Sequence, residues 1–315
     1  GNIVGVAGAI LVGGPGAVFW MWLIAFFGMM TNYSENVLGI FYRRKNELGE
    51  WSGGAMYYLR DGLGAKKGCK TVGKVLAAAF SVFCFLASFG IGNMTQVNSI
   101  SGNVYSVFGM PTWATGIVML ILCGLVIVGG LKRIATVTEK IVPFMVLIYM
   151  VGTIAILVKN FAMIPAVFTA IFEGAFALKA AGGGIVGYGI KLAIEQGMKR
   201  GVFSNEAGLG SSVMVHSNSN VREPVRQGMW GIFEVFADTM VVCTLTAFTV
   251  LSSGLIDLDT GIAVTEYAGV ALTKANLVST VFTMNFGWLG GAFVAIAIVL
   301  FAYSTVLGWS HYGSK

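Results

Sequence analysis

Three long stretches of the sequence carry no charged residue at all. They run from Gly1 to Ser34, from Val75 to Leu131 and from Asn276 to Ser314. A helix needs about 20 apolar residues to cross the hydrocarbon core of a bilayer, so the middle stretch alone can hold two crossings. These runs lack the alternation of apolar and polar residues that is typical of a transmembrane barrel. We therefore predict an all-α membrane protein.

Composition and length set the scale of this membrane domain. Hydrophobic residues make up 56% of the chain and charged residues only 11%, whereas soluble domains carry about 25% charged residues. A chain of 315 residues has room for roughly eight crossings with short loops. Both ends adjoin apolar segments, so we expect a membrane domain that is truncated at both ends.

Most of the basic residues are concentrated in alternate loops between the predicted spans. Such an arrangement indicates cytoplasmic loops in a bacterial-type inner membrane, because positive charge is retained on the cytoplasmic side. The net charge of +6 then reports orientation, and we expect no nucleic-acid partner. The basic residues concerned are Arg43, Arg44, Lys45, Arg60, Lys66, Lys67, Lys70, Lys74, Lys132, Arg133, Lys140, Lys199, Arg200, Arg222 and Arg226.

The hydropathy pattern predicts the following order of elements. We expect spans near residues 17–42, 75–107, 111–130, 138–158, 229–251 and 288–309. An interfacial helix with turns is expected in 46–64, and a surface helix in 161–180. The stretch 255–276 is expected to form an outer loop that contains a helix.

Two weak, glycine-rich hydrophobic segments stand at corresponding places in the two halves of the chain. The first is residues 1–10, which end near the breaker sequence Gly13-Gly14-Pro15-Gly16, and the second is 182–212. Paired interrupted segments of this kind are a pointer to an inverted repeat with a binding site at the midplane. Glycines that merely allow close helix packing are the alternative. We prefer the site for 201–212, because polar residues crowd the same stretch.

Seven blocks of sequence, in the same order, resemble the alanine or glycine:cation symporter family. They are GNIVGVA, GGPGAVFWMW, GGAMYYLRDGLG, FGIGNMTQVNSI, KRGVFSNEAGLGSS, PVRQGMWGIFEVFADT and YSTVLGWSHYG. The resemblance covers the whole chain. It implies a LeuT-type fold with five-plus-five inverted repeats and coupling to sodium, occasionally to protons. Residues 1–160 would be a first repeat lacking the first half of helix one, and 182–315 a partial second repeat.

An amino acid zwitterion within a membrane requires dipoles or charges that meet its carboxylate and its ammonium. Free N–H groups and carbonyls at broken helices supply them, so we expect Gly1 and Asn2 to belong to the substrate site. Asn93 and Gln96 lie three residues apart on one helical face, which Ser99 extends. Their chemistry alone fits a ligand or an interhelical clamp equally well. The family resemblance favours substrate contact by Gln96.

The second interrupted segment breaks within 201–212, and this second break supplies three more candidates for the substrate site. The resemblance implies that Phe203 forms the aromatic side of the pocket, with Ser204 and Asn205 lining unwound backbone. An aromatic residue over a small pocket would exclude large side chains. A core aromatic is the alternative interpretation of Phe203.

Ser304 and Thr305 stand side by side, with Trp309 one turn below Thr305. Paired hydroxyls together with backbone carbonyls suit a small hard cation. Hydrogen bonding of both hydroxyls to their own helix is the alternative. In LeuT-type folds this helix faces the first helix, so the resemblance implies a sodium site formed by Ile3, Ser304 and Thr305. Thr305 and Trp309 would also border the substrate.

Acidic residues within spans are costly and are therefore functional by default. Glu234 and Asp238 lie four residues apart on one face, and Glu206 falls in the second break. We predict that these three residues act in gating or in orienting helices. Glu35 lies nearer the cytoplasm and is likewise taken as functional. We assign no site role to the two histidines, and place His216 in a cytoplasmic loop.

These features together predict a secondary active transporter, a sodium-coupled symporter of alanine or glycine that acts as a monomer without an organic cofactor. A proton-coupled symporter of the same fold is the first alternative. It would need a titratable group at the cation position, for which Glu206 and Asp238 are candidates. A membrane-embedded enzyme ranks low, because the spans contain no histidine with a serine partner and no HExxH motif. Composition does not exclude a channel, which could not concentrate its substrate.

Overall fold

The computed structural model describes residues 1–47, 49–176 and 183–314. Almost all of its elements are helices, and five helical stretches are long and apolar enough to cross a membrane. This confirms a helical, multi-pass membrane protein. The five stretches are α2 (Gly16–Tyr42), Lys70–Phe108, α7 (Gly130–Lys159), Pro224–Leu251 and α14 (Trp288–Gly313).

Two of the five stretches are built from consecutive helices joined by π-helical turns. The first contains α4 (Lys70–Ala87), η2 (Ser88–Met94) and α5 (Thr95–Phe108). The second contains α11 (Pro224–Val235), η4 (Phe236–Cys243) and α12 (Thr244–Leu251). A π turn shifts backbone hydrogen bonds from i−4 to i−5 and is frequent at functional sites. Both turns lie in the middle of a predicted span.

The remaining helices are shorter. They are α1 (Val4–Gly13), α3 (Ala55–Tyr57), η1 (Tyr58–Leu63), α6 (Thr112–Ile127), η3 (Phe161–Met163), α8 (Ile164–Phe176), α9 (Gly183–Asn205), α10 (Ser212–His216) and α13 (Leu277–Phe286). The surface helix predicted in 161–180 is described up to Phe176, and residues 177–182 lie outside the described part of the chain. At about 1.5 Å per residue, the ten residues of α1 cover roughly half of the hydrocarbon core.

The helix expected in 255–276 is wrong. The described backbone there forms a small hairpin, in which β3 (Glu266–Tyr267) pairs with β4 (Val270–Ala271). The Asp257 carboxylate accepts hydrogen bonds from the backbone N–H groups of Thr260 and Asp259. These donors lower the pKa of that carboxyl, and they favour a turn in place of a helix.

The segment 46–64 contains the expected short helical turns, α3 and η1. A hairpin of β1 (Arg44–Lys45) and β2 (Trp51–Ser52) precedes them, which the sequence analysis did not predict. The Arg43 guanidinium lies 4.1 Å from the centre of the Trp51 ring and donates to the carbonyl of Ser217 at 3.0 Å. Two basic loops therefore meet at one end of the molecule, as a common cytoplasmic side requires.

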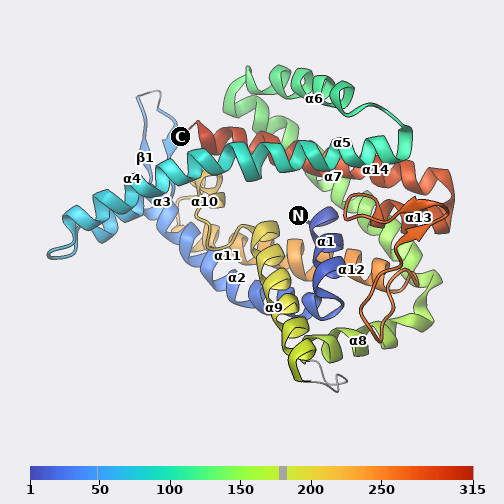
Figure 1. The fold of residues 1–315 in the computed structure, drawn as a ribbon. Helices are drawn as coiled ribbons and strands as arrows, with labels where there is room; N and C mark the ends of the chain where they lie inside the picture. The colour runs from blue at the N-terminus through green and yellow to red at the C-terminus, as the bar shows by residue number, and fades with distance from the viewer. Residues whose placement is uncertain (48, 177–182, 315) are drawn as a thin grey trace.

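Helices from the two halves of the chain pack against one another (Figure 1). Helix α2 packs against α9 and α11, and α1 packs against α9, while α14 lies against α5, α7 and α13. The β1 strand, α10 and the C-terminal end lie toward the left of the view, and α4 extends beyond them to the far left. The two weak segments of the sequence are thus brought into contact, because α1 packs against α9.

Glycines allow the closest helix crossings in this bundle. A Cβ on Gly16 would lie 2.3 Å from the backbone of Gly174, and a Cβ on Gly197 would lie 2.3 Å from the carbonyl oxygen of Ala17. Contacts of this length place the backbone of α2 directly against α8 and α9. Small residues at such crossings are characteristic of helix packing in membranes, so the packing interpretation holds for these glycines.

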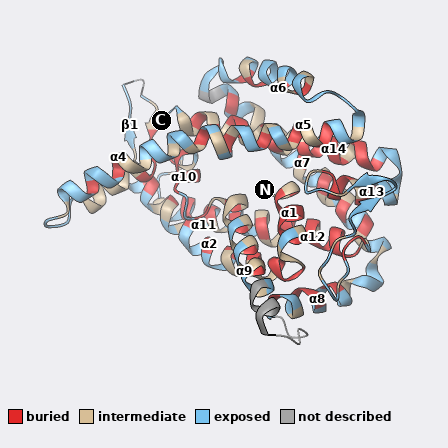
Figure 2. Ribbon diagram, viewed as in Figure 1, coloured by how far each residue is buried: buried red, intermediate tan, exposed pale blue. Residues whose placement is uncertain are grey.

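Burial divides the molecule into an inner and an outer part (Figure 2). Helices α1 and α12 are largely buried, whereas α4, α6 and α7 expose many apolar side chains. Leu120 is 72% exposed and Phe83 is 70% exposed. Apolar exposure on this scale suits contact with lipid tails or with further helices.

Candidate functional site

The start of the first segment lies against the end of α9. A Cβ on Gly1 would lie 2.7 Å from the hydroxyl oxygen of Ser204. The Asn2 amide donates to the Asp238 carboxylate at 2.5 Å, so the first segment is also tied to the π turn η4. Three elements that are distant in sequence therefore meet at one point.

The second break comprises residues 206–211, between α9 and α10. Helix α9 continues to Asn205, so the unwound backbone begins at Glu206, and Ser204 and Asn205 border it. Both belong to the last helical turn, because the glycines that allow positive φ come later, at Gly208 (87°) and Gly210 (69°). Glu206 also has a positive φ, of 57°.

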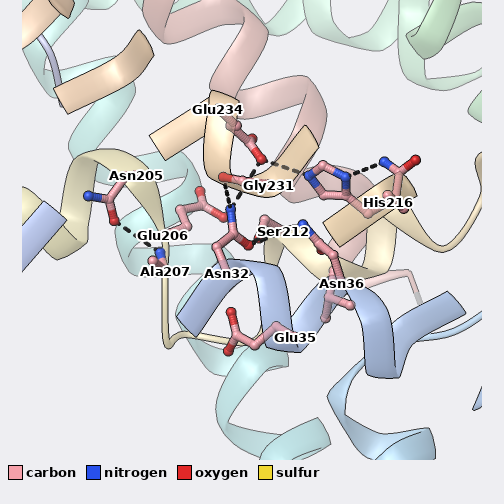
Figure 3. Close-up of polar contacts among 12 residues, drawn as sticks. Asn32, Glu35, Asn36, Asn205, Glu206, Ala207, Ser212, His216, Gly231 and Glu234 are labelled. Atoms are coloured by element: carbon pink, nitrogen blue, oxygen red, sulfur yellow. Dashed lines mark hydrogen bonds and ion pairs between the residues drawn. The ribbon is translucent and has the colours of Figure 1, made fainter. Parts of the chain in front are cut away.

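Side chains accept the backbone donors that the break leaves free. The Asn205 side-chain oxygen accepts the N–H of Ala207 at 3.0 Å, and the Glu35 carboxylate accepts the N–H of Gly208 at 3.1 Å. Asn205 also donates to the Thr239 hydroxyl at 3.0 Å. The break is thus held by α2 on one side and, through Asn205, by η4 on the other; Figure 3 shows Glu35, Asn205 and Ala207 at the break.

A second polar network connects α2, α10 and α11 next to the break (Figure 3). The Glu234 carboxylate accepts from the Asn32 amide at 3.3 Å and contacts His216 Nε2 at 2.7 Å. The other ring nitrogen of His216 contacts the Gln227 amide. The placement of His216 in a loop is wrong. It ends α10, and both of its partners lie on α11, the next helix along the chain.

A cavity of about 630 Å³ lies between α7, the second break, the α11–η4 region and the C-terminal half of α14. Four carboxylates line it, and none of its described lining residues is Lys or Arg. Such a cavity favours cations and ammonium groups over anions. The lining contains these residues predicted for the site: Asn2, Ser204, Asn205, Glu206, Glu234, Asp238, Ser304, Thr305 and Trp309.

With this geometry established, comparison with known proteins gives the family. The family model described as "Sodium:alanine symporter family" matches residues 1–315. The chain belongs to this family. Its relatives include the sodium/alanine symporter AgcS of Methanococcus maripaludis, which is 44% identical over 315 residues, covering 100% of this chain and 66% of AgcS.

Two proteins of Bacillus subtilis are also similar to the chain. The uncharacterized transporter YflA is 40% identical over 314 residues, with 100% of this chain and 63% of YflA covered. The amino-acid carrier protein AlsT is 37% identical over 315 residues, with 99% of this chain and 62% of AlsT covered. The chain therefore spans a little under two thirds of the length of these relatives. Family and relatives alike are transporters by name.

Four predicted site residues of this symporter-family chain lie outside the cavity lining: Gly1, Ile3, Gln96 and Phe203. Ile3 is 4% exposed, and its carbonyl accepts the N–H of Ala7 within α1. Phe203 lies at the end of α9, with the Arg200 guanidinium 5.8 Å from its ring centre. The ligand roles of these residues stay predictions.

Gln96 and Asn93 make hydrogen bonds within their own helix. The Gln96 amide donates to the carbonyl of Ile91 at 3.3 Å, and the Asn93 amide donates to that of Ser88 at 2.9 Å. Each acceptor lies five residues earlier, in the π turn η2. The amides therefore bond the π turn itself, which is neither of the two roles that the sequence suggested.

The hydroxyls of Ser304 and Thr305 both donate to the carbonyl of Phe301 at 2.9 Å. This is the hydrogen bonding to the own helix that the sequence allowed as an alternative. A donating hydroxyl retains lone pairs on its oxygen, and both residues line the cavity. Sodium coordination at this pair therefore stays a prediction.

Proposed function

We propose that this protein is a secondary active transporter that carries a small neutral amino acid, alanine or glycine, into the cell together with sodium. The observation that carries the proposal is the junction of α1, the second break and η4 beside an acidic cavity in a transmembrane bundle. Membership of the sodium:alanine symporter family supports both the substrate and the ion. The transporter would lie in the inner membrane of a bacterial-type cell, with its basic loops in the cytoplasm.

We further propose a LeuT-type arrangement, in which residues 1–160 and 182–315 belong to two inverted repeats. The support is the position of the two interrupted segments. Helix α1 is about half a span long and packs against α9, whose end is the second break. In such repeats the unwound ends face a common midplane site. That symmetry leads us to expect that the interrupted segments of the two halves meet.

The chemistry of the junction suits a zwitterion. The substrate ammonium would be attracted by the carboxylates of the cavity, and its carboxylate would take N–H donors at the helix ends. Asn2, Ser204 and Asn205 would orient it, with Gln96, Phe203 and Trp309 as further contacts. Sodium would bind the carbonyl of Ile3 and the hydroxyls of Ser304 and Thr305. We propose action as a monomer.

Proton coupling is a second candidate, and one observation favours it. Asp238 and Glu206 both line the cavity, so a titratable carboxylate is available on the transport path. A proton carried by either group could replace sodium as the driving ion. The hydroxyls of Ser304 and Thr305 do not titrate, which favours sodium.

Uptake of labelled alanine into proteoliposomes that contain the full-length protein separates the candidates. An inward sodium gradient should drive accumulation above equilibrium, and potassium should not replace sodium. Unchanged uptake in sodium-free buffer under a pH gradient alone would establish the proton mechanism instead. Failure to accumulate alanine against its gradient under any ion condition would contradict the transporter proposal.

A further inference from the structure

Glu206 combines two unusual features at the second break. Its backbone φ is 57°, and among the described residues only Ala268 shares a positive φ without being glycine. This conformation is unfavourable for a residue that carries a Cβ. Such strain persists where the surroundings impose it, and functional sites are enriched in it. A glycine would be the expected residue, so the side chain of Glu206 calls for an explanation.

The Glu206 carboxylate connects the break to α14. One oxygen accepts the indole N–H of Trp309 at 3.0 Å, and the other accepts the hydroxyl of Ser211 at 2.6 Å. Ser211 closes the break at the start of α10, whereas Trp309 lies on a helix more than a hundred residues away in sequence. One side chain thus joins both ends of the break to the opposite wall of the cavity.

The indole of Trp309 is enclosed on its other sides. A Cβ on Gly92, in the π turn η2, would lie 2.5 Å from Cβ and Cγ of Trp309. The ring of Tyr312 packs against it edge to face, with the ring centres 5.1 Å apart. Trp309 is only 4% exposed. Its single polar atom needs an acceptor in this environment, and Glu206 supplies it.

We propose that Glu206 is a positioning residue, which clamps the Trp309 indole between the second break and η2 and so fixes the shape of the cavity wall that meets the substrate. The backbone strain at Glu206 is offset by the two hydrogen bonds of its carboxylate. The break cannot change its geometry without releasing the indole. The consequence for substrate binding rests on the proposed transport function, whereas the clamp itself does not.

The clamp can be observed without any transport measurement. The full-length protein is labelled with 5-fluorotryptophan, and the Trp309 fluorine resonance is assigned as the one that is lost in Trp309→Phe. Glu206→Ala should shift and broaden this resonance. Glu206→Gln should leave it near its original position, because the amide oxygen still accepts the indole N–H. A resonance that is unmoved in Glu206→Ala would overturn the proposal.

A glycine variant separates the side chain from the backbone. Glu206→Gly adopts a positive φ without strain, so the protein should remain folded, and the loss of the carboxylate should still release the indole. Glu139→Ala is the matched control, because it removes another carboxylate of the cavity lining on α7. It should leave the Trp309 resonance in place. An equal shift in both alanine variants would mean that cavity charge, and not the clamp, sets the indole environment.

Transport then tests the consequence for the substrate. Glu206→Ala should raise the KM for alanine about tenfold, with Vmax within about twofold, as expected for one lost hydrogen bond that orders a binding wall. In a Trp309→Phe background the same substitution should add little, because the two residues act as one unit. Additive effects would overturn the clamp as a determinant of binding. An inactive wild type would contradict the proposed function and leave the fluorine result standing.

Discussion

The two interrupted segments of this protein are held in different ways. Helix α1 and the turn that joins it to α2 depend on close backbone approach, with Gly13 beside the carbonyl of Leu192 and Gly16 beside Gly174. The second break depends on side chains, because Glu35 and Asn205 accept its backbone donors and Glu206 connects it to α14. The α1–α2 turn is therefore shaped by steric contact, whereas the start of the first segment at Asn2 and the second break are held by polar contacts.

The difference shows what kind of change each segment can tolerate. A steric contact between backbones cannot adjust to an added methyl group, since neither partner has a side chain that can rotate. A polar contact tolerates any substitution that keeps an acceptor in place and fails when the acceptor is removed. The α1–α2 turn and the second break should therefore respond to opposite kinds of mutation.

The largest effect is expected at the α2–α8 crossing. Gly16→Ala places a Cβ 2.3 Å from the Gly174 backbone, so the helices must move apart, at a cost of about 3 kcal/mol of folding free energy. Thermal unfolding of the detergent-solubilised protein measures this. Gly5→Ala is the matched control, because a Cβ on Gly5 meets no described atom within 4 Å. Equal stability of the two variants would contradict the steric account.

The next effect concerns the polar tie between the first segment and η4. Asp238→Ala removes the acceptor of both the Asn2 amide and the Thr239 hydroxyl, and should cost about 1–3 kcal/mol. Asp238→Asn keeps an acceptor oxygen and should restore most of the stability. Alanine uptake by the asparagine variant then reports on the charge alone. If the asparagine variant is as unstable as the alanine variant, the loss of hydrogen bonds does not explain the loss of stability.

A smaller effect is expected where Glu35 caps the second break. Glu35→Ala leaves the Gly208 N–H without its acceptor, a loss comparable to that of a helix cap, about 1 kcal/mol. Hydrogen exchange should become faster at residues 207–212, with little change in α1. Glu35→Gln retains an acceptor and should exchange nearly as slowly as the wild type. Faster exchange in α1 as well would show that the two segments are not held independently.

The smallest effect is expected at the predicted sodium site. Thr305→Val keeps the shape but removes one hydroxyl, so the sodium concentration for half-maximal alanine binding should rise about threefold, under 1 kcal/mol. Saturating sodium should restore the affinity, because ion and substrate binding are reciprocally linked. A sodium dependence equal to that of the wild type would mean that the Thr305 hydroxyl does no more than donate to the carbonyl of Phe301. Weak alanine binding even at high sodium would indicate direct contact with the substrate.

The sequence predicted most of the spans, because a membrane helix is specified by local hydrophobicity; the span expected at 111–130 is α6, whose 16 residues fall short of the five long stretches. The predicted spans at 17–42 and 288–309 correspond to α2 and α14. The helix expected in 255–276 was wrong, since β-branched residues and an Asp257 turn favour a hairpin there. The π turns η2 and η4 were not predicted. A shift of one residue in backbone bonding leaves hydropathy unchanged, and no local pattern in this chain indicates it.

The sequence also singled out most residues of the cavity, because polar atoms within apolar runs are conspicuous. The sequence was a poorer guide to the hydrogen-bond partners of these residues. His216 was set aside, yet it contacts Glu234 and Gln227. Glu35 was recognised as an intramembrane acid, but its contact with Gly208 was not foreseen. A charged or titratable residue indicates that a partner is needed, and the sequence does not say which helix supplies it.

The sequence by itself determined that this chain is a bundle of membrane helices with two interrupted segments, and it identified the family through motifs. These properties depend on residues that are near neighbours in the chain. Only the tertiary structure decided that α1 meets the end of α9 and η4, that Glu206 reaches Trp309, and that Gly92 leaves room for the indole. Those contacts join residues that are far apart in sequence. Their geometry follows from how helices cross, which backbone approach and side-chain volume decide together.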